Sequence, residues 1–192
     1  RENKVMSLKT RFGNLGNILN FDNLTEENIY VLDSPILTNS QLKKFKKFFS
    51  KKIKIIDCTF DIKSSLKDRI ESIREEAETA VREGSTCLIL SDKNISDKKA
   101  GIPSILTVGG VHSHLVKHGL RGYCSLNVEC SDALDTHSFA VLIGVGATTV
   151  NPYLAIDSIY QRFEKKLFGK LDFESCVTRF KKSIDAGLLK IM

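Results

Sequence analysis

The stretch Thr10–Leu19, TRFGNLGNIL, contains the residue types that cradle phosphate groups. Its glycines, Gly13 and Gly16, are each followed by asparagine, and Lys9 and Arg11 lie close by. A phosphate-binding loop follows a strand, opens a helix and has a G-x-G-x-x-G or P-loop pattern. This stretch has neither glycine pattern, and no strand is expected before it. Because Gly-Asn steps favour turns with positive φ, we expect a compact strap that packs against a partner surface.

Three histidines could bind a metal ion. His114 and His118 are one helical turn apart, whereas His112 lies two residues from His114 and so faces another side of a helix. A zinc site needs three or four converging ligands, usually with a supporting carboxylate, and this helix carries no acid. We therefore predict no metal site and interpret the histidines as polar-face or interface residues.

Polar residues stand at the ends of the strand-like runs. In a parallel sheet, ligands collect beyond the carboxyl ends of the strands, so these residues could bind a small molecule. They could instead cap the helices that follow. We favour this capping interpretation over ligand binding. The set comprises Asp33, Ser34, Asp57, Thr59, Ser91, Asp92, Glu129 and Asn151.

The glycines of IGVGATTVN, Gly144 and Gly146, lie between an expected helix and an expected strand. A dinucleotide fingerprint requires the reverse order, so these glycines indicate a tight turn. No Ser-His-Asp set, carboxylate pair or cysteine nucleophile emerges from the patterns. We predict no catalytic, cofactor-binding or metal-binding residue in this chain.

Strand-like and helical patterns alternate from about residue 29, which predicts an α/β fold with a mainly parallel sheet. About five strands are too few for a complete barrel, leaving an incomplete (β/α) barrel or an open doubly wound sheet. Residues 1–28 are expected to form a strap or linker belonging to the same domain as residues 29–192. Expected strands cover 29–32, 53–57, 86–90, 123–128 and 148–151; after a lysine-rich helix, expected helices cover 66–83, a stretch ending near 118, 135–143, 154–168 and 173–191.

Local signals accompany some of these elements. Ser65, with Asp68 three residues later, resembles a capping box at the start of the 66–83 helix, and Gly84 supplies its stop. The run at 86–90 is continuously apolar, which predicts a strand covered on both faces. A polar loop is expected at 92–100.

The composition fits one globular, cytoplasmic domain of 192 residues, 42% of them hydrophobic. The longest apolar run, 139–155, is too short and too polar at its end for a membrane span. Arg1 and its neighbours precede no apolar run, so no signal peptide is expected, and the missing initiator methionine indicates a piece of something longer. The five cysteines form no C-x-x-C pair and are expected to be reduced.

The net charge of +6 is concentrated in LKKFKKFFSKKIK, which holds seven lysines between Lys43 and Lys54. Interleaved phenylalanines make a nucleic-acid-binding surface conceivable. Leu42, Phe45, Phe48 and Phe49 nevertheless fall at helical spacing, with the lysines on the opposite side of the helix. We interpret the segment as an amphipathic helix with a solvated face and expect no nucleic-acid partner.

Six segments, taken together, resemble the central domain of the glutamate synthase large subunit. They occur in that family's order, at close to its spacing, and cover nearly the whole chain. Ser113 replaces a frequent histidine and Val145 a frequent aromatic residue, which weakens any metal role for the histidines. The segments are RENKVMSLKTRFGNLGNIL, LDSPIL, EAETAVREGSTCLILSD, IPSILTVGGVHSHLVKHGLR, HSFAVLIGVGATTVNPYLA and DAGLLKIM.

The resemblance implies a multidomain enzyme that makes glutamate from glutamine and 2-oxoglutarate. Its amidotransferase domain releases ammonia, which travels through a tunnel to an FMN-bearing barrel. There the imine is reduced by electrons that reach the flavin from NADPH or ferredoxin through an iron–sulfur cluster, usually with the help of a small electron-donating subunit. The central domain joins the two catalytic domains, so the present chain is expected to be inactive alone.

An ammonia tunnel needs small, neutral hydrogen-bonding groups. Ser7, Thr10, Gly13 and Gly16 supply such groups in the strap, which we hypothesise lines or gates the tunnel at a domain junction. A strap that only packs is the favoured alternative. Two other functions stay open: a stand-alone small-molecule-binding α/β domain that uses the strand ends, and a basic nucleic-acid-binding module.

Overall fold

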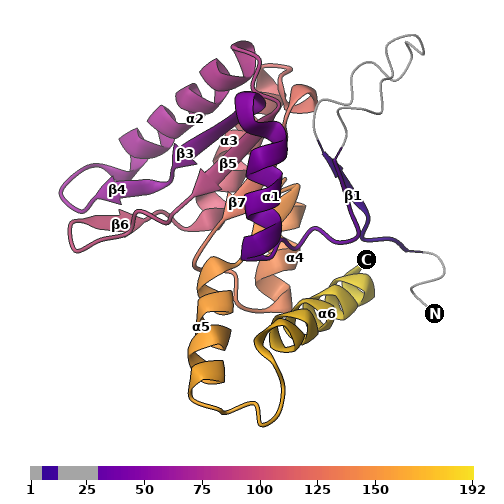
Figure 1. Cartoon of the computed structure of the whole chain (residues 1–192). Helices are drawn as coiled ribbons and strands as arrows, with labels where there is room; N and C mark the ends of the chain where they lie inside the picture. Colours follow the sequence, from indigo (N-terminus) through magenta and orange to yellow (C-terminus); the bar gives the residue numbers. More distant parts are fainter. Residues whose placement is uncertain (1–5, 13–29) are drawn as a thin grey trace.

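The computed structural model describes residues 6–12 and 30–192 of the chain. Its centre is a parallel sheet of four strands in the order β3-β5-β7-β8 (Figure 1). The expectation of an α/β fold with a parallel sheet is thereby confirmed. The strands are β3 (Ile53–Asp57), β5 (Cys87–Ser91), β7 (Ser125–Glu129) and β8 (Thr149–Asn151).

Helices connect and follow these strands, close to the predicted positions. In α2, the side chain of Ser65 caps the first turn by accepting from the backbone N–H of Asp68, and Gly84 follows the helix with φ +96°. Both features agree with the predicted capping and stop signals. The helices are α1 (Asn39–Phe49), α2 (Leu66–Arg82), α3 (Ser104–Lys117), α4 (Thr136–Gly144), α5 (Tyr153–Glu164) and α6 (Phe173–Ile191), with short 3-10 turns at Ser50–Lys52 and Arg121–Tyr123.

The side chains of the central strands alternate between two hydrophobic cores, because neighbouring residues of a strand face opposite sides of a sheet. Leu88 and Leu90 of β5 belong to the larger core, which α2, α3 and α4 cover. Ile89 belongs to the smaller core, where it joins Phe45 of α1. All residues of β5, β7 and β8 are buried, so these strands are covered on both faces.

The predicted first strand, residues 29–32, does not join the parallel sheet. Tyr30–Leu32 forms β2, which pairs antiparallel with β1 (Thr10–Phe12). Ile36 lies beside the parallel sheet instead, in a parallel bridge to Val150 of β8. The expected strand is therefore present as β2, but the expectation that it would be a fifth strand of the parallel sheet was wrong, because an apolar run does not specify its partner.

The bridge at Ile36 explains why α1 lies on the opposite face from α2, α3 and α4. From β3 to β8 each connection moves one strand along the sheet in the same direction, and its helix lies on one face. From Ile36, at the β8 edge, the chain must cross back to β3 at the other edge. Because parallel crossovers are right-handed, reversing the direction places α1 on the other face, in front of the strands in Figure 1. This arrangement corresponds to the open doubly wound alternative.

A small antiparallel pair was missed by the sequence analysis. β4 (Thr59–Asp61), where no element was predicted, pairs with β6 (Lys99–Gly101), which overlaps the end of the polar loop expected at 92–100. Strands of three residues with exposed, polar ends carry no hydrophobic periodicity, so they leave no local signal. The pair extends from one end of the sheet (Figure 1).

Within residues 6–12 and 30–192, no helix has the length and apolar character that crossing a bilayer demands. All five cysteines are free and buried, which agrees with the prediction that they are reduced. α6 packs against α4 and α5 and thereby completes the larger core through Ile184 and Leu188.

Candidate functional site

Four of the predicted strand-end residues form a row across the sheet. Asp57 is in register with Ser91, Ser91 with Glu129, and Glu129 with Asn151. The parallel sheet therefore aligns residues from four separate stretches of the chain along the carboxyl ends of its strands. The row holds half of the eight residues for which the sequence analysis considered small-molecule binding and favoured helix capping.

Glu129 is the most deeply buried acid of the row, with 3% of the residue exposed. Its carboxylate accepts hydrogen bonds from Lys46 Nζ at 3.2 Å, Lys93 Nζ at 3.1 Å and Ser91 Oγ at 3.0 Å. Burial opposes ionisation, but the hydrogen bond from Lys93 and the charges of Lys46 and Lys93 outweigh it, so the pKa of Glu129 lies below its ordinary value. The carboxylate is therefore ionised and ties α1 to the end of the sheet.

The other acids at this edge are also engaged within the chain. Asp92 Oδ2 accepts from the backbone N–H of Ser131 at 2.9 Å and from its hydroxyl at 2.6 Å. Asp57 accepts from the backbone and hydroxyl of Thr59 at 3.0 and 2.8 Å. Burial, followed by the nearby charge of Asp92 and a hydrogen bond to it, raises the pKa of Tyr153.

The interpretation of the strand-end residues as helix caps was wrong. The four helix N-termini capped by a side chain use Thr38, Ser65, Asp135 and Asp172, none of which belongs to the strand-end set. Asn151 instead donates to the backbone carbonyl of Leu37 at 2.8 Å. The strand-end residues thus connect segments distant in sequence, because short connections at this edge bring those segments next to one another.

Two of the three predicted histidines come together with an acid that the sequence analysis did not consider. Nε2 of His114 lies 2.7 Å from Oε2 of Glu78 on α2, and Nδ1 of His118 lies 3.7 Å from the same oxygen. Hydrogen bonds from Arg82 and His114 lower the pKa of Glu78. The carboxylate stood outside the helix that was searched, 36 residues upstream of His114, so local spacing could not reveal it.

His112 faces elsewhere, as predicted. Its Nδ1 accepts a hydrogen bond from Nε of Arg121 at 3.1 Å. Burial and then the charge of Arg121 lower the pKa of His112. Arg121 also donates to the carbonyl oxygens of Cys124 at 2.6 Å and Gly146 at 2.8 Å, so this group holds the other end of the sheet together.

Of the residues hypothesised to line a tunnel, Ser7 and Thr10 lie in the described part of the chain, whereas Gly13 and Gly16 lie outside it. Ser7 is exposed and its Oγ accepts from the backbone N–H of Lys9 at 3.2 Å. Thr10 is half-buried in β1, and its hydroxyl donates to the carbonyl of Leu8 at 3.0 Å. Both side chains are small, neutral and polar, as the hypothesis requires.

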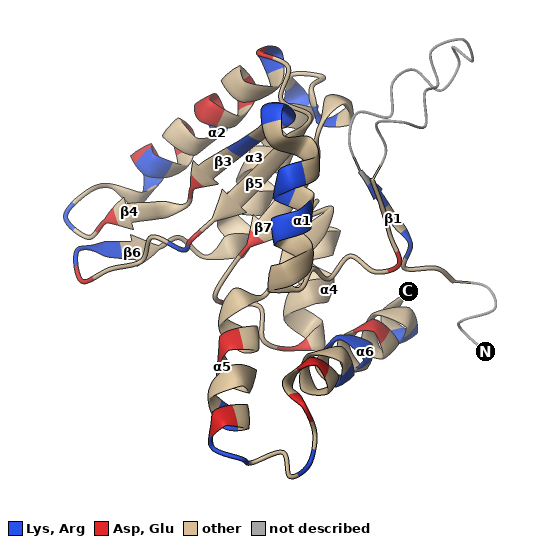
Figure 2. Cartoon of the chain, in the orientation of Figure 1, with Lys and Arg blue, Asp and Glu red and all other residues tan. Residues whose placement is uncertain are grey.

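The lysine-rich helix is amphipathic, as predicted. Phe45 is fully buried and Leu42 and Phe49 nearly so, while the lysines lie on the opposite side (Figure 2). The expectation that Phe48 shares the buried face was wrong, because half of this residue is exposed. Lys46 leaves that solvated face to pair with Glu129. The segment thus has structural tasks on both of its faces, which favours the solvated-helix interpretation over a nucleic-acid-binding surface.

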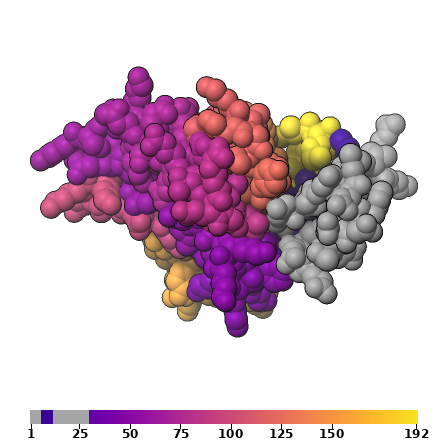
Figure 3. Space-filling model, turned by 90° about the horizontal axis from the view of Figure 1, so that it is seen from above, coloured from indigo at the N-terminus to yellow at the C-terminus, as the bar shows by residue number. Residues whose placement is uncertain are grey.

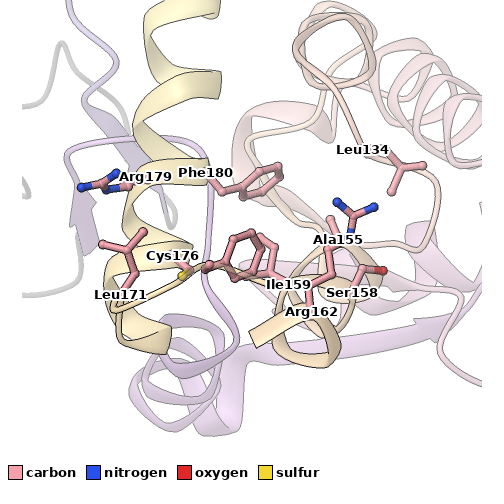
Figure 4. A pocket seen from close by; sticks show the side chains of 10 residues that line it. Leu134, Ala155, Ser158, Ile159, Arg162, Leu171, Cys176, Arg179 and Phe180 are labelled. Carbon is pink, nitrogen blue, oxygen red and sulfur yellow. The ribbon is translucent and has the colours of Figure 1, made fainter. Parts of the chain in front are cut away.

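An apolar pocket of about 520 Å³ lies between α5 and α6. Figure 4 shows Ile159 and Phe180 among its lining side chains, together with Arg162 and Arg179. The sequence analysis gave no sign of it, because each helix contributes only part of the lining. It is separate from the strand-end row, whose residues do not line it.

Comparison with known proteins identifies the family. The chain matches the glutamate synthase central domain over residues 1–192. It is 48% identical to the NADPH glutamate synthase large chain of Azospirillum brasilense and 36% identical to the ferredoxin-dependent chloroplastic glutamate synthase of Spinacia oleracea, in both cases over 100% of this chain and 13% of the relative. It is also 36% identical to the NADPH glutamate synthase large chain of Bacillus subtilis, over 12% of that protein. The chain therefore spans about an eighth of these relatives, and it belongs to the glutamate synthase central domain family.

Proposed function

We propose that this chain is the connecting domain of a glutamate synthase. The parent enzyme would form glutamate from glutamine and 2-oxoglutarate with electrons from NADPH or ferredoxin. The observation that carries this proposal is the family match along all 192 residues, together with relatives that are named glutamate synthases and are about eight times longer. The parent enzyme would contain FMN and an iron–sulfur cluster, both held outside this chain.

The partners of this domain would be the amidotransferase and FMN-barrel domains of the same polypeptide. A small electron-donating subunit would complete an NADPH-dependent form. Both electron donors, NADPH and ferredoxin, appear among the names of the relatives. The proposal therefore does not choose between them. We propose a cytoplasmic location, which the free, buried cysteines support.

The domain itself would be non-catalytic. Three of its strand-end acids, Glu129, Asp92 and Asp57, are already bonded to lysines, serines and threonines of the same chain. Burial raises the pKa of Cys58 and of Cys87 to about 12, which suppresses the thiolate that a nucleophile needs. These contacts support a framework role over the alternative of a stand-alone small-molecule-binding domain.

The finer proposal is that residues 7–16 help to line or gate the ammonia tunnel. Ammonia is small and neutral, so its path must offer hydrogen bonds without a fixed charge that would trap ammonium. Thr10 supports the proposal because it combines partial exposure with a hydroxyl that, among the described residues, bonds to the nearby Leu8 carbonyl. Replacing that hydroxyl with a methyl group would leave the strand pairing with Leu32 in place.

The test is Thr10→Val in the full-length enzyme, with Thr79→Val on the exposed side of α2 as the matched control. Glutamine hydrolysis, glutamate formation and free ammonia are measured together. A lining role predicts continued hydrolysis, less glutamate per glutamine and ammonia in solution for Thr10→Val alone. One-to-one coupling in a correctly folded Thr10→Val enzyme would remove Thr10 from the tunnel while leaving the domain assignment intact.

A further inference from the structure

Two packed helices bring three potential metal ligands together at the surface. His114 and His118 occupy the C-terminal end of α3, and Glu78 stands on α2, which packs against α3. One nitrogen of each histidine and one carboxylate oxygen of Glu78 all lie within 4.8 Å of one another. Figure 3 looks onto this end of the molecule, where the magenta surface of α2 adjoins the salmon surface that follows α3.

We propose that Glu78, His114 and His118 form a binding site for a zinc ion, with water as the fourth ligand. Two imidazoles and one carboxylate are a ligand set that zinc accepts, with bonds of about 2.0–2.2 Å. In a tetrahedral site such bonds separate the ligand atoms by roughly 3.4 Å. The distances from Glu78 Oε2 to the two histidine nitrogens, 2.7 and 3.7 Å, bracket that value.

The neighbours of the three residues suit a metal. The second carboxylate oxygen of Glu78 is 2.8 Å from Arg82, one turn further along α2. Arg82 therefore orients the carboxylate and leaves Oε2 directed at the histidines, as outer partners of metal ligands do. The side chains of Glu78, His114 and His118 are 22%, 19% and 34% exposed, so an ion in solution can reach them.

The protons of the two rings can be placed from their partners. Nδ1 of His118 lies 2.9 Å from the carbonyl oxygen of His114, and Nε2 of His114 lies 2.7 Å from the Glu78 carboxylate. Because both partner oxygens only accept, both nitrogens carry protons in this arrangement. On binding zinc, each of these nitrogens would give its proton to solvent and offer its lone pair to the metal. A ring that was neutral would take up a proton on its other nitrogen, so each ring would keep one proton.

The sequence analysis predicted no metal because α3 contains no acid. That reasoning searched one helix, and the carboxylate comes from another. The function of such a site would be to join α2 to α3 at the surface. The residues of the strand-end row take no part in it.

The test measures zinc in the full-length protein after equilibration with micromolar free zinc and gel filtration. The variants are Glu78→Gln, which keeps the side-chain size, and His118→Ala; the matched control is His137→Ala, which removes an exposed histidine on α4. We expect the wild type and the control to carry one zinc per chain more than the two site variants. Zinc affinity should fall at least about tenfold when a ligand is lost.

X-ray absorption at the zinc edge gives a second measurement that does not depend on folding of the variants. The spectrum of zinc bound to the wild type should show two imidazole nitrogens among its light-atom ligands. Equal zinc content in all four proteins, with circular dichroism showing that they are folded, would overturn the proposal. Binding that depends on His137 rather than on Glu78 and His118 would overturn it as well.

Discussion

The backbone of Gly146 lies directly against the imidazole of His112. A Cβ on Gly146 would lie 2.9 Å from the Cβ of His112 and closer still to its ring, and the residue has φ +118°. Gly146 follows α4 and leads into β8, where its carbonyl accepts from Arg121. The close approach therefore joins the turn predicted from IGVGATT to one of the three predicted histidines.

Gly146→Ala should destabilise the chain by about 2–4 kcal/mol, because alanine is strained at this φ and its methyl group would collide with His112. The matched control is Gly144→Ala two residues earlier. Gly144 has open space around it and no positive φ. Alanine there should leave the free energy of unfolding unchanged or raise it by up to about 1 kcal/mol. Urea unfolding of both variants measures the difference, and equal stabilities would contradict the argument.

Glu129→Gln should lower the free energy of unfolding by about 1–3 kcal/mol, because it leaves Lys46 and Lys93 without a charged acceptor. The effect should depend on pH. Since the folded-state pKa of Glu129 lies below its ordinary value of 4.5, its stabilising contribution is complete above that value. It is lost as the pH falls through the lowered folded-state pKa.

The difference between wild type and Glu129→Gln, measured by urea unfolding, should therefore be constant between pH 6 and 8 and shrink below about pH 4.5. Glu75→Gln, an exposed acid on α2, is the control. It should change stability by no more than about 0.5 kcal/mol. A difference for Glu129→Gln that grows on acidification would show that the carboxylate is not stabilised as an ion.

The buried thiols should resist alkylation. Burial raises the pKa of Cys58 and Cys87 to about 12. Burial also raises the pKa of Cys124. Iodoacetamide at pH 7.5 should react at least about a hundredfold more slowly with the folded chain than with the chain in urea. Mass spectrometry counts the labels, and Ser50→Cys, at an exposed position, supplies a reactive control.

A fast reaction of Cys58 or Cys87 in the folded chain, at a rate near that of Ser50→Cys, would contradict this expectation. It would also weaken the proposal that the domain is non-catalytic. Slow labelling of all five native cysteines is expected from their burial.

Several features were determined by the sequence alone, because each depends on residues close together in the chain. The periodicity from Leu66 to Glu83 and the cap at Ser65 predicted α2, and the continuous apolar run at 86–90 predicted a strand covered on both faces. The order of the six segments also identified the family that the comparison confirmed.

The tertiary structure decided which of these local elements meet. Residues 29–32 look like a strand in any context, but pairing with β1 rather than with the parallel sheet depends on the path taken by Ile36 beside Val150. Likewise, neither Glu129 with Lys46 nor Glu78 with His114 is visible in local spacing, since 83 and 36 residues separate them. Hydrophobic periodicity specifies which face of an element is buried, whereas polar partners are chosen only when the packed elements bring their ends together.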